Sequence, residues 1–205
     1  LYPEIAPLET GHLDVGDGTV HLKENGKLLF AYLILALGSE TNFFEIPGLK
    51  EHALCFKTFN HAIGVRNAIW FEVEKGSPRL HVVVGGGGST GVELAGEIKE
   101  WFCGLVDDKH AMCTIEVTVI EGAPTILSGF DSRVRAAVEE RLTRLGVKIR
   151  TGTPIASLKE KRVMLANGEA LHFDVFVWAG GVKASPITKR LKFKQETRGR
   201  IEIGD

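Results

Sequence analysis

The chain has 205 residues with 25 Lys and Arg against 26 Asp and Glu, which gives a formal net charge of −1 at pH 7. This balance excludes a basic nucleic-acid-binding protein and a disordered polyelectrolyte, and a hydrophobic content of 44% is that of an ordinary globular protein. A chain of this length forms one domain, or one domain and part of a second. Glycine alone exceeds its usual share, because 24 glycines are present and several are clustered.

The three cysteines, Cys55, Cys103 and Cys113, include no Cys-x-x-Cys pair. We therefore expect reduced, mostly structural thiols and a cytoplasmic protein. The histidines have no metal-ligand spacing relative to the cysteines, so we expect no metal. The sequence has no apolar run near the ~18 residues that a membrane span needs. Because it opens with Leu1 rather than Met, we expect a cut from a longer protein.

The N-terminal part of the chain alternates short apolar runs with turn residues, which predicts a small β-meander. An apolar run then ends at Gly38, and such a run is typical of a strand buried on both faces in a parallel sheet. The turn-rich stretch 39–48 is expected to cross into the next domain. The elements predicted in this part are strands at 19–22, 28–30 and 32–38, a turn at 24–27, and a helix at 60–74.

The rest of the chain alternates strand and helix signals, and a strand, a glycine loop and a helix occur there in that order. Asp131 is the predicted N-cap of the second of these helices, and Gly146 is its stop. The order of the elements predicts an α/β fold with a parallel sheet. The predicted elements are strands at 81–84, 115–120 and 147–150, helices from 92 through 105 and at 132–145, and further strands at 155–158, 162–165, 170–173 and 175–178.

The glycine loop contains the pattern G-x-G-x-x-G at Gly86, Gly88 and Gly91. Gly86 permits a tight turn after the strand, Gly88 lets backbone N–H groups approach a pyrophosphate, and Gly91 lets the helix pack closely on the sheet. The phosphate then binds at the helix N-terminus, where free N–H groups and the dipole favour an anion. The prediction is a dinucleotide site, with a flexible surface loop as the alternative. Its residues are Gly86, Gly87, Gly88, Ser89, Thr90 and Gly91.

Glu121 ends the second strand of the predicted sheet. A carboxylate at this place can accept hydrogen bonds from both ribose hydroxyls of an adenosine, and its charge repels a 2′-phosphate. The next three residues, Gly-Ala-Pro, supply no Arg or Lys to bind such a phosphate. The prediction is therefore NAD(H) rather than NADP(H), and the alternative is a solvated glutamate at a strand end.

The glycine loop with its flanks resembles the NAD-binding loop of the flavin-dependent pyridine nucleotide oxidoreductases. In particular it resembles that of type II NADH dehydrogenases, the single-subunit NADH:quinone oxidoreductases. The matching blocks keep the family's order along nearly the whole chain, and the last of them, Val-Trp-Ala-Gly-Gly-Val, is the most specific to the dehydrogenase branch. The blocks are residues 82–97, 35–40 with 46–48, 119–121 with 126–127, and 177–182.

The resemblance implies an FAD-dependent enzyme that transfers a hydride from NADH to the flavin and passes electrons on to a quinone. It also implies a Rossmann-like NAD(H)-binding domain, a parallel sheet with helices plus a β-meander, at 43–178. This domain would be inserted in remnants of a split FAD-binding domain at 1–42 and 179–205. The family's N-terminal FAD-binding G-x-G-x-x-G is absent, as is its C-terminal region with quinone and membrane contacts. We therefore expect a fragment that is incomplete for catalysis.

The resemblance also implies roles for single residues. Glu93 would lie beside the nicotinamide, near the flavin, and would influence hydride or proton movement. The alternative is an acid in the first helical turn that complements the helix dipole. Gly181 and Val182 would approach the nicotinamide through their backbone, and Ala36 to Gly38 would run past the adenosine or pyrophosphate part of FAD.

Other classes of protein stay open. The sulfide:quinone reductase and ferredoxin reductase branches of the family remain alternatives, because the residues that distinguish them lie partly outside this fragment. A dithiol mechanism is disfavoured, because Cys55 is the only cysteine between Gly38 and Gly86. A different class is a non-catalytic NAD-binding module or redox sensor, since a chain without the main FAD loop has no evident acceptor for hydride.

The expected partners are NADH and a quinone or other electron acceptor, with no nucleic acid. The stretch Lys183 to Arg200 holds seven basic residues and one acidic residue, Glu196, and it faces either solvent or anionic lipid. We also expect a homodimer, and peripheral contact with the cytoplasmic face of a membrane through the missing C-terminal region.

Overall fold

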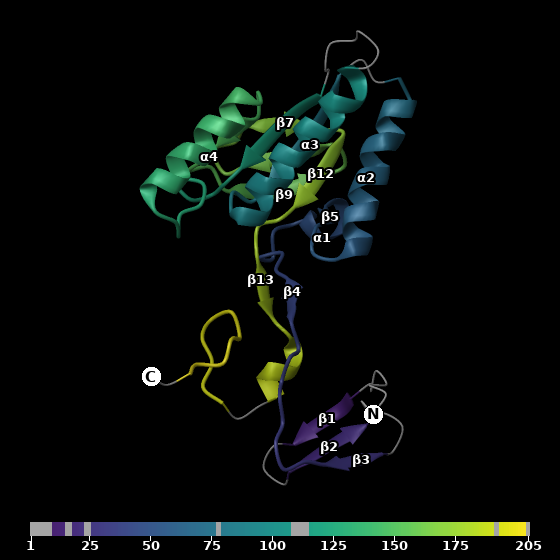
Figure 1. Cartoon of the computed structure of the whole chain (residues 1–205), viewed down its shortest axis with the longest axis vertical. Helices are drawn as coiled ribbons and strands as arrows, with labels where there is room; N and C mark the ends of the chain where they lie inside the picture. The colour runs from purple at the N-terminus through teal and green to yellow at the C-terminus, as the bar shows by residue number, and fades with distance from the viewer. Residues whose placement is uncertain are drawn as a thin grey trace. The chain divides into compact units, whose positions relative to one another are not determined.

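A computed structural model of the chain describes residues 10–14, 18–22, 26–76, 79–107, 115–190 and 193–203. The chain divides into two compact units. The larger unit is the continuous segment 41–181, and the smaller unit combines 1–40 with 182–205. Figure 1 shows both units and labels many of their helices and strands.

The larger unit is built on a five-stranded parallel sheet in the order β5-β12-β6-β7-β8. The central strand β6 ends level with both of its neighbours, because Gly85 lies opposite Ile120 on β7 and Trp178 on β12. The carboxyl ends of these three strands therefore meet at one edge. The strands are β5 (Leu54–Cys55), β6 (Leu80–Gly85), β7 (Ile115–Ile120), β8 (Lys148–Arg150) and β12 (Val175–Trp178).

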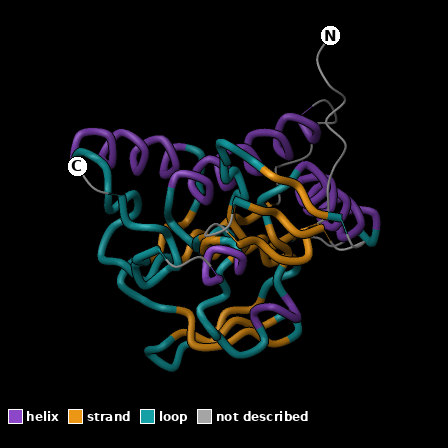
Figure 2. Tube along the Cα trace, turned by 90° about the horizontal axis from the view of Figure 1, so that it is seen from below, coloured by secondary structure: helices purple, strands orange, loops and turns teal. Residues whose placement is uncertain are grey.

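The parallel sheet is covered on both faces, and strand residues alternate between two cores. Val82 and Val84 of β6 belong to the core under the three long helices, whereas Val83 belongs to the core on the opposite face. An antiparallel sheet, β9 to β11, and the short α1 cover that opposite face, and Figure 2 shows the resulting layers. These elements are α1 (Leu49–His52), α2 (Phe59–Glu74), α3 (Ser89–Asp107), α4 (Ser132–Arg144), β9 (Ile155–Lys159), β10 (Arg162–Leu165) and β11 (Ala170–His172).

The helix boundaries follow their capping residues. Thr58 Oγ1 accepts a hydrogen bond from His61 N at 3.2 Å at the start of α2, and Asp131 caps α4 as predicted by accepting from Arg133 N at 2.9 Å. α3 begins at Ser89, three residues before the predicted start. The glycine at position 91 conceals this start in the sequence, because glycine is a poor helix former.

The smaller unit contains the predicted N-terminal β-meander, in which β2 pairs antiparallel with both β1 and β3. Glu24 and Asn25, the first two residues of the predicted turn, lie outside the described residues. β4 pairs with β13 in a two-stranded sheet, and the last residue of β4, Thr41, is the first residue of the larger unit. The elements are β1 (Thr10–Asp14), β2 (Thr19–Leu22), β3 (Lys27–Leu29), β4 (Ser39–Thr41), β13 (Val182–Ala184) and the 3₁₀ helix η1 (Pro186–Arg190).

The predicted buried strand at 32–38 is wrong. These residues form no strand, and Tyr32 and Ile34 are 94% and 91% exposed. A strand buried on both faces needs hydrogen-bonded neighbours and a covering layer on each side. None of the described strands pairs with residues 32–38. The run is apolar, but in the described structure it has no neighbouring strand with which to form a sheet.

The expectation of three reduced thiols is also wrong, because Cys103 is disulfide-bonded while Cys55 is free. A disulfide depends on the distance between Cα atoms in space, which spacing along the sequence does not reveal. Within the described ranges, no helix is long and apolar enough to cross a membrane. The same ranges contain no group of three His, Cys, Asp or Glu side chains that could hold a metal ion.

Candidate functional site

The candidate site lies at the carboxyl edge of the parallel sheet, where the strand order reverses. Along the chain, β7 and β8 are added on one side of β6, and β12 is then added on its other side. Ligands of open α/β sheets bind in the crevice at such a switch point. The glycine loop leaves β6 here, Glu121 follows β7, and residues 179–181 follow β12. The fold therefore brings three predicted parts of the site to one edge.

Gly86 is required by its backbone conformation and by its neighbours. Its φ of 116° is one that L side chains rarely adopt. A Cβ there would lie 2.6 Å from the Gly180 Cα and 2.7 Å from the Ala179 carbonyl carbon. Ala179 N also donates a hydrogen bond of 2.8 Å to the Gly85 carbonyl oxygen. The turn off β6 therefore packs directly against the segment that follows β12.

Gly88 stands in open space, because a Cβ at this position would have no atom within 4 Å. Gly88, Ser89 and Thr90 are exposed, whereas Gly86 and Gly87 are buried. Since α3 begins at Ser89, the first N–H groups of the helix, which lack intrahelical acceptors, lie along this exposed stretch. The arrangement is an open cradle suited to an anion.

Gly91 has a packing role, although its closest partner is not the one that we predicted. A Cβ at this position would lie 1.8 Å from the Gly86 carbonyl oxygen and 3.6 Å from the Ala179 Cβ. The helix therefore needs glycine here chiefly because its first turn presses on the loop's own backbone. Packing on the sheet is the lesser constraint.

The loop backbone holds the Glu121 carboxylate in place. Oε2 accepts a hydrogen bond from Gly87 N at 2.6 Å, and Oε1 accepts one from Ala123 N at 2.7 Å. An ionised carboxylate offers about four acceptor positions, so Glu121 can anchor the loop and still accept further hydrogen bonds. The bond to Gly87 was missed in the sequence because it joins residues 34 positions apart.

The segment after β12 is held by contacts that the sequence does not reveal. Trp178 Nε1 donates to the Asn42 carbonyl oxygen at 2.8 Å, and the Trp178 ring lies 6.3 Å from the Phe44 ring, nearly perpendicular to it. A Cβ at Gly180 would lie 2.3 Å from the Trp178 ring. Gly181 has a φ of 146°, and its carbonyl accepts from Asn42 N at 3.0 Å. The only signal in the sequence was the aromatic residue before the Ala-Gly-Gly run.

Glu93 is exposed and lies one turn beyond the start of α3. The first turn of α3 contains no acidic residue, so the alternative in which Glu93 complements the dipole from that turn is wrong. Glu93 and Ser89 line the same groove, of about 410 Å³, between α3 and α4. The Glu93 carboxylate therefore belongs to a surface that adjoins the cradle.

The remaining predicted residues lie in the smaller unit. Ala36 and Gly38 are exposed, and Gly38 has a φ of 63°. Val182 is 47% exposed. The larger unit thus collects the glycine loop, Glu121, Glu93 and Gly181, whereas Ala36, Gly38 and Val182 belong to the other unit.

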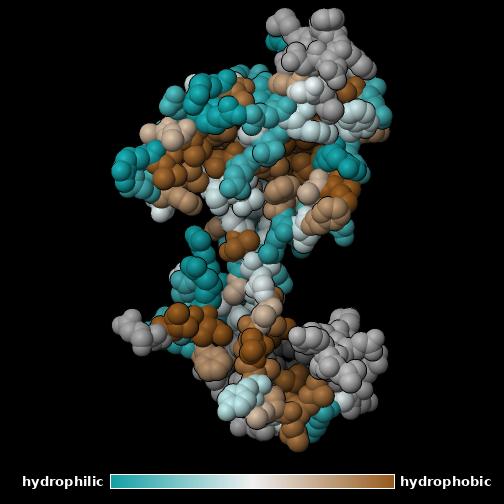
Figure 3. Space-filling view, in the orientation of Figure 1, coloured by the Kyte–Doolittle hydropathy of each residue, from teal (hydrophilic) through white to brown (hydrophobic). Residues whose placement is uncertain are grey.

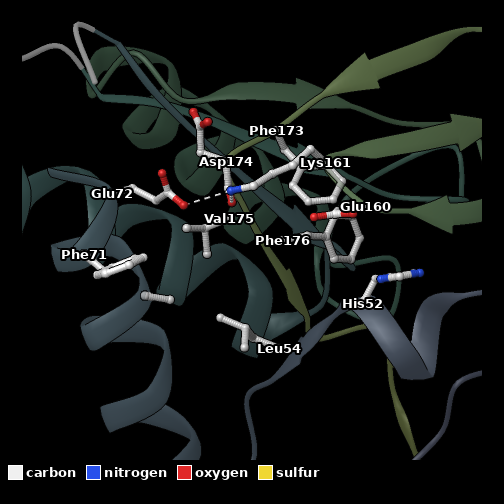
Figure 4. Close-up of a pocket in the computed structure, with 11 residues that line it drawn as sticks. His52, Leu54, Phe71, Glu72, Glu160, Lys161, Phe173, Asp174, Val175 and Phe176 are labelled. Atoms are coloured by element: carbon white, nitrogen blue, oxygen red, sulfur yellow. Dashed lines mark hydrogen bonds and ion pairs between the residues drawn. The ribbon is translucent and has the colours of Figure 1, made fainter. Parts of the chain in front are cut away.

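A second hollow, of about 230 Å³, lies beside α2 near the amino end of β12 (Figure 4). Lys161 Nζ donates to Glu72 Oε1 at 2.9 Å and to the Asp174 carbonyl oxygen at 2.6 Å. The hydrogen bond from Lys161 is the largest cause that lowers the pKa of Glu72, whose side chain is 12% exposed. This ion pair joins α2 to the turn before β10. It stabilises the fold at the end of the sheet opposite the glycine loop.

Together, the parallel sheet, the glycine loop after its central strand and the acid at the end of the next strand define a Rossmann-like α/β fold. The chain belongs to a family described as pyridine nucleotide-disulphide oxidoreductase, whose sequence profile matches residues 8–205. This membership confirms the family that the sequence resembled.

Relatives with related names match most of the chain. It is 34% identical over 191 residues to the internal alternative NAD(P)H-ubiquinone oxidoreductase A1, mitochondrial, of Arabidopsis thaliana, covering 87% of this chain and 37% of that protein. It is 26% identical over 200 residues to a probable NADH dehydrogenase of Dictyostelium discoideum, covering 91% of this chain and 44% of that protein. The chain therefore spans less than half the length of these relatives.

Solved structures agree on the fold. A structure of NDH2 from Plasmodium falciparum in complex with NADH matches with a TM-score of 0.78 and 24% identity, over 90% of this chain and 42% of that one. A ferredoxin reductase from Rhodopseudomonas palustris matches with a TM-score of 0.76 and 19% identity, over 94% of this chain and 44% of that one. These likenesses establish the fold, which the sequence predicted as α/β and Rossmann-like.

Proposed function

We propose that the larger unit binds NAD(H) within an FAD-dependent NADH:quinone oxidoreductase. The observation that carries the proposal is the open space at Gly88, at the start of α3, on the edge where Glu121 is fixed. A cradle that a Cβ would partly fill suits a pyrophosphate, because the phosphate oxygens need close approach to backbone N–H groups. The expected NAD domain at 43–178 falls inside this unit.

In this proposal the residues of the chain bind and orient the dinucleotide. The backbone from Gly86 to Gly91 holds the pyrophosphate, and Glu121 accepts the adenosine ribose hydroxyls. The nicotinamide lies toward Gly181 and Val182, and Glu93 acts beside it. Orientation is the contribution of the protein, because the hydride chemistry belongs to the cofactors.

The flavin and the quinone are proposed for the complete protein. When bound, FAD accepts a hydride and releases electrons singly or in pairs. Ala36 to Gly38 and the segments 1–42 and 179–205 are proposed to contribute to its site on the basis of the family resemblance. The quinone as electron acceptor is supported by the names of the relatives, among them an NAD(P)H-ubiquinone oxidoreductase.

A homodimer and peripheral membrane contact remain proposals for the complete protein. The cytoplasmic location expected from the sequence is a proposal too, and the relatives from Arabidopsis thaliana are named mitochondrial. Lys183 to Arg200 are proposed to face solvent rather than lipid. This preference is supported by ion pairs within the stretch and beside it, in which Lys194 pairs with Glu202 and Arg200 with Glu196.

Direct titration with NADH tests the proposed nucleotide site. Gly88→Val should abolish the binding of NADH, followed by NADH fluorescence, because the new side chain occupies the pyrophosphate position. Gly129→Val is the matched control, since a Cβ at Gly129 would also have no atom within 4 Å and Gly129 lacks a positive φ. Normal affinity in Gly88→Val would refute the assignment.

The visible spectrum of the complete polypeptide separates the oxidoreductase from the non-catalytic module. Flavin bands that NADH bleaches are expected. A colourless full-length protein that still binds NADH would support the module or sensor, for which the single glycine loop of the chain is the favouring observation.

A further inference from the structure

The helical face of the larger unit contains an apolar groove that extends away from the nucleotide cradle, between α3 and α4. Val92, Leu127 and Leu142 form its floor and are 5%, 5% and 3% exposed. Phe130 and Val134 also line the groove, and they are 50% and 45% exposed. Figure 3 shows hydrophobic residues gathered between hydrophilic ones over these helices. The groove therefore continues into apolar surface that water contacts.

The groove exists because α4 turns only part of its apolar stripe into the core. Val134, Val138 and Leu142 recur with helical spacing, and such a stripe is expected to be buried along its length. Leu142 is buried, whereas Val134 is exposed. On the facing helix, a Cβ at Gly96 would meet only the tips of Leu142 and Leu145, at 3.7 and 3.9 Å. The missing side chain of Gly96 thus deepens the groove above the ends of Leu142 and Leu145.

The charges on the groove have an excess of carboxylates. Glu93 and Glu97 line it one helical turn apart on α3, and in the described part of the chain neither forms an ion pair. Glu100 pairs with Arg141 of α4, the one cation among the lining residues. Like charges four residues apart on a helix repel each other. A cationic occupant would relieve this repulsion.

We propose that the groove binds a basic amphipathic helix of a partner protein. Its apolar side chains, spaced i, i+3 or i+4 and i+7, would lie on the floor, and its Lys or Arg residues would pair with Glu97, which the nucleotide proposal does not use. A small cation would leave Phe130 and Val134 in water. A second copy of this chain that presented the same face would oppose carboxylates to carboxylates. Apolar shape and charge together therefore favour a basic helix.

A synthetic peptide tests the proposal. The probe is a fluorescein-labelled helix of about 18 residues, long enough to form in water, with a leucine stripe flanked by lysines. Its twin carries glutamate in place of every lysine. Fluorescence anisotropy on the whole chain should show saturable binding of the lysine peptide only. Glu97→Lys should weaken that binding by about tenfold or more.

Glu140→Lys is the matched control, because it makes the same charge change at a side chain of α4 that is 70% exposed and does not line the groove. It should change peptide affinity by less than about twofold. Both variants should bind NADH as the wild type does, which separates this test from the nucleotide proposal. Equal loss in both variants, equal binding of the two peptides, or no binding at about 1 mM peptide would overturn the proposal.

Analytical ultracentrifugation distinguishes a partner helix from a second copy of this chain as the occupant of the groove. A monomeric chain whose peptide binding is lost in Val134→Asp supports the partner helix. A wild-type dimer that Val134→Asp dissociates would assign the groove to a second copy instead, and would overturn the proposal.

Discussion

The carboxylate of Glu121 accepts a hydrogen bond of 2.6 Å from the backbone N–H of Gly87. The residue proposed to bind the ribose is thus attached to the loop proposed to bind the pyrophosphate. Ile120 adds a second link, because its carbonyl oxygen accepts from Gly86 N at 2.8 Å. The ends of β6 and β7 therefore form one rigid edge, and a change at Glu121 acts on the loop as well as on the nucleotide.

Glu121→Ala is expected to weaken NADH binding by about tenfold or more, since hydrogen bonds to a charged group contribute about 1.5–3 kcal/mol. The variant should also lose discrimination against NADPH, because the charge that repels a 2′-phosphate is gone. Calorimetric titration with both nucleotides measures the two effects. Glu51→Ala, which removes an exposed carboxylate on α1, should leave both affinities unchanged. An unaltered ratio of the NADH and NADPH affinities in Glu121→Ala would contradict the ribose role.

Gly91→Ala and Gly96→Ala should shift stability in opposite directions, although both lie in α3. The Cβ at position 91 meets the Gly86 carbonyl oxygen at 1.8 Å, and overpacking of this kind costs about 1–3 kcal/mol. At position 96 the nearest atom is 3.7 Å away, so alanine gains up to about 1 kcal/mol of helix propensity. Thermal unfolding should therefore show a lower Tm for the first variant and a higher Tm for the second, by about 2–4 °C per kcal/mol. A lower Tm in both would show that Gly96 is also needed for packing.

The elements of the larger unit could be predicted because their signals are local. β7 is rich in β-branched residues, which favour a strand in any setting, and α4 is bounded by Asp131 and Gly146. The run at 32–38 misled for the same reason. Apolar composition is local, whereas burial depends on a neighbouring strand that is absent from the described residues.

The candidate site also has a part that the sequence shows and a part that it does not. The glycines of the loop could be placed from the sequence, because their spacing forms a pattern within six consecutive residues, 86–91. The support for the loop could not, because Glu121 bonds Gly87 and Trp178 bonds Asn42 across separations of 34 and 136 residues. Only the pairing of β12 beside β6 brings the Trp178 segment to this edge.

Trp178→Phe tests the hydrogen bond between Trp178 and Asn42, which joins residues far apart in the sequence. The variant keeps an aromatic ring but removes the donor to the Asn42 carbonyl oxygen, and a lost hydrogen bond that leaves a partner unsatisfied costs about 1–3 kcal/mol. Urea unfolding should show this loss with an unchanged m-value. Trp70→Phe is the matched control, because the Trp70 side chain is 47% exposed and its indole bonds Glu74 on the same helix. A loss of stability in Trp70→Phe as large as in Trp178→Phe would argue against a special role for the Asn42 contact.

The Glu72–Lys161 ion pair gives the fold a defined dependence on acid. The hydrogen bond from Lys161 holds the pKa of Glu72 below its ordinary value of 4.5 in the folded protein. A group whose pKa is lowered by folding stabilises the protein above the unfolded-state pKa, and this contribution is lost as the pH falls through the folded-state value. Glu72→Gln should therefore be less stable than the wild type at pH 7, by about 1 kcal/mol or more.

The difference between the two proteins should shrink as the pH falls below 4.5, because protonated Glu72 and glutamine are both neutral. Thermal unfolding of both proteins, from pH 7 down to the lowest pH at which they are still folded, measures this convergence of their stabilities. Glu51→Gln should follow the wild type at every pH, since no ion pair of Glu51 occurs in the described structure. A gap between Glu72→Gln and the wild type that stayed constant through the acid range would mean that Glu72 stabilises the fold by packing. In that case the hollow beside α2 would owe its shape to the Glu72 side chain rather than to its charge.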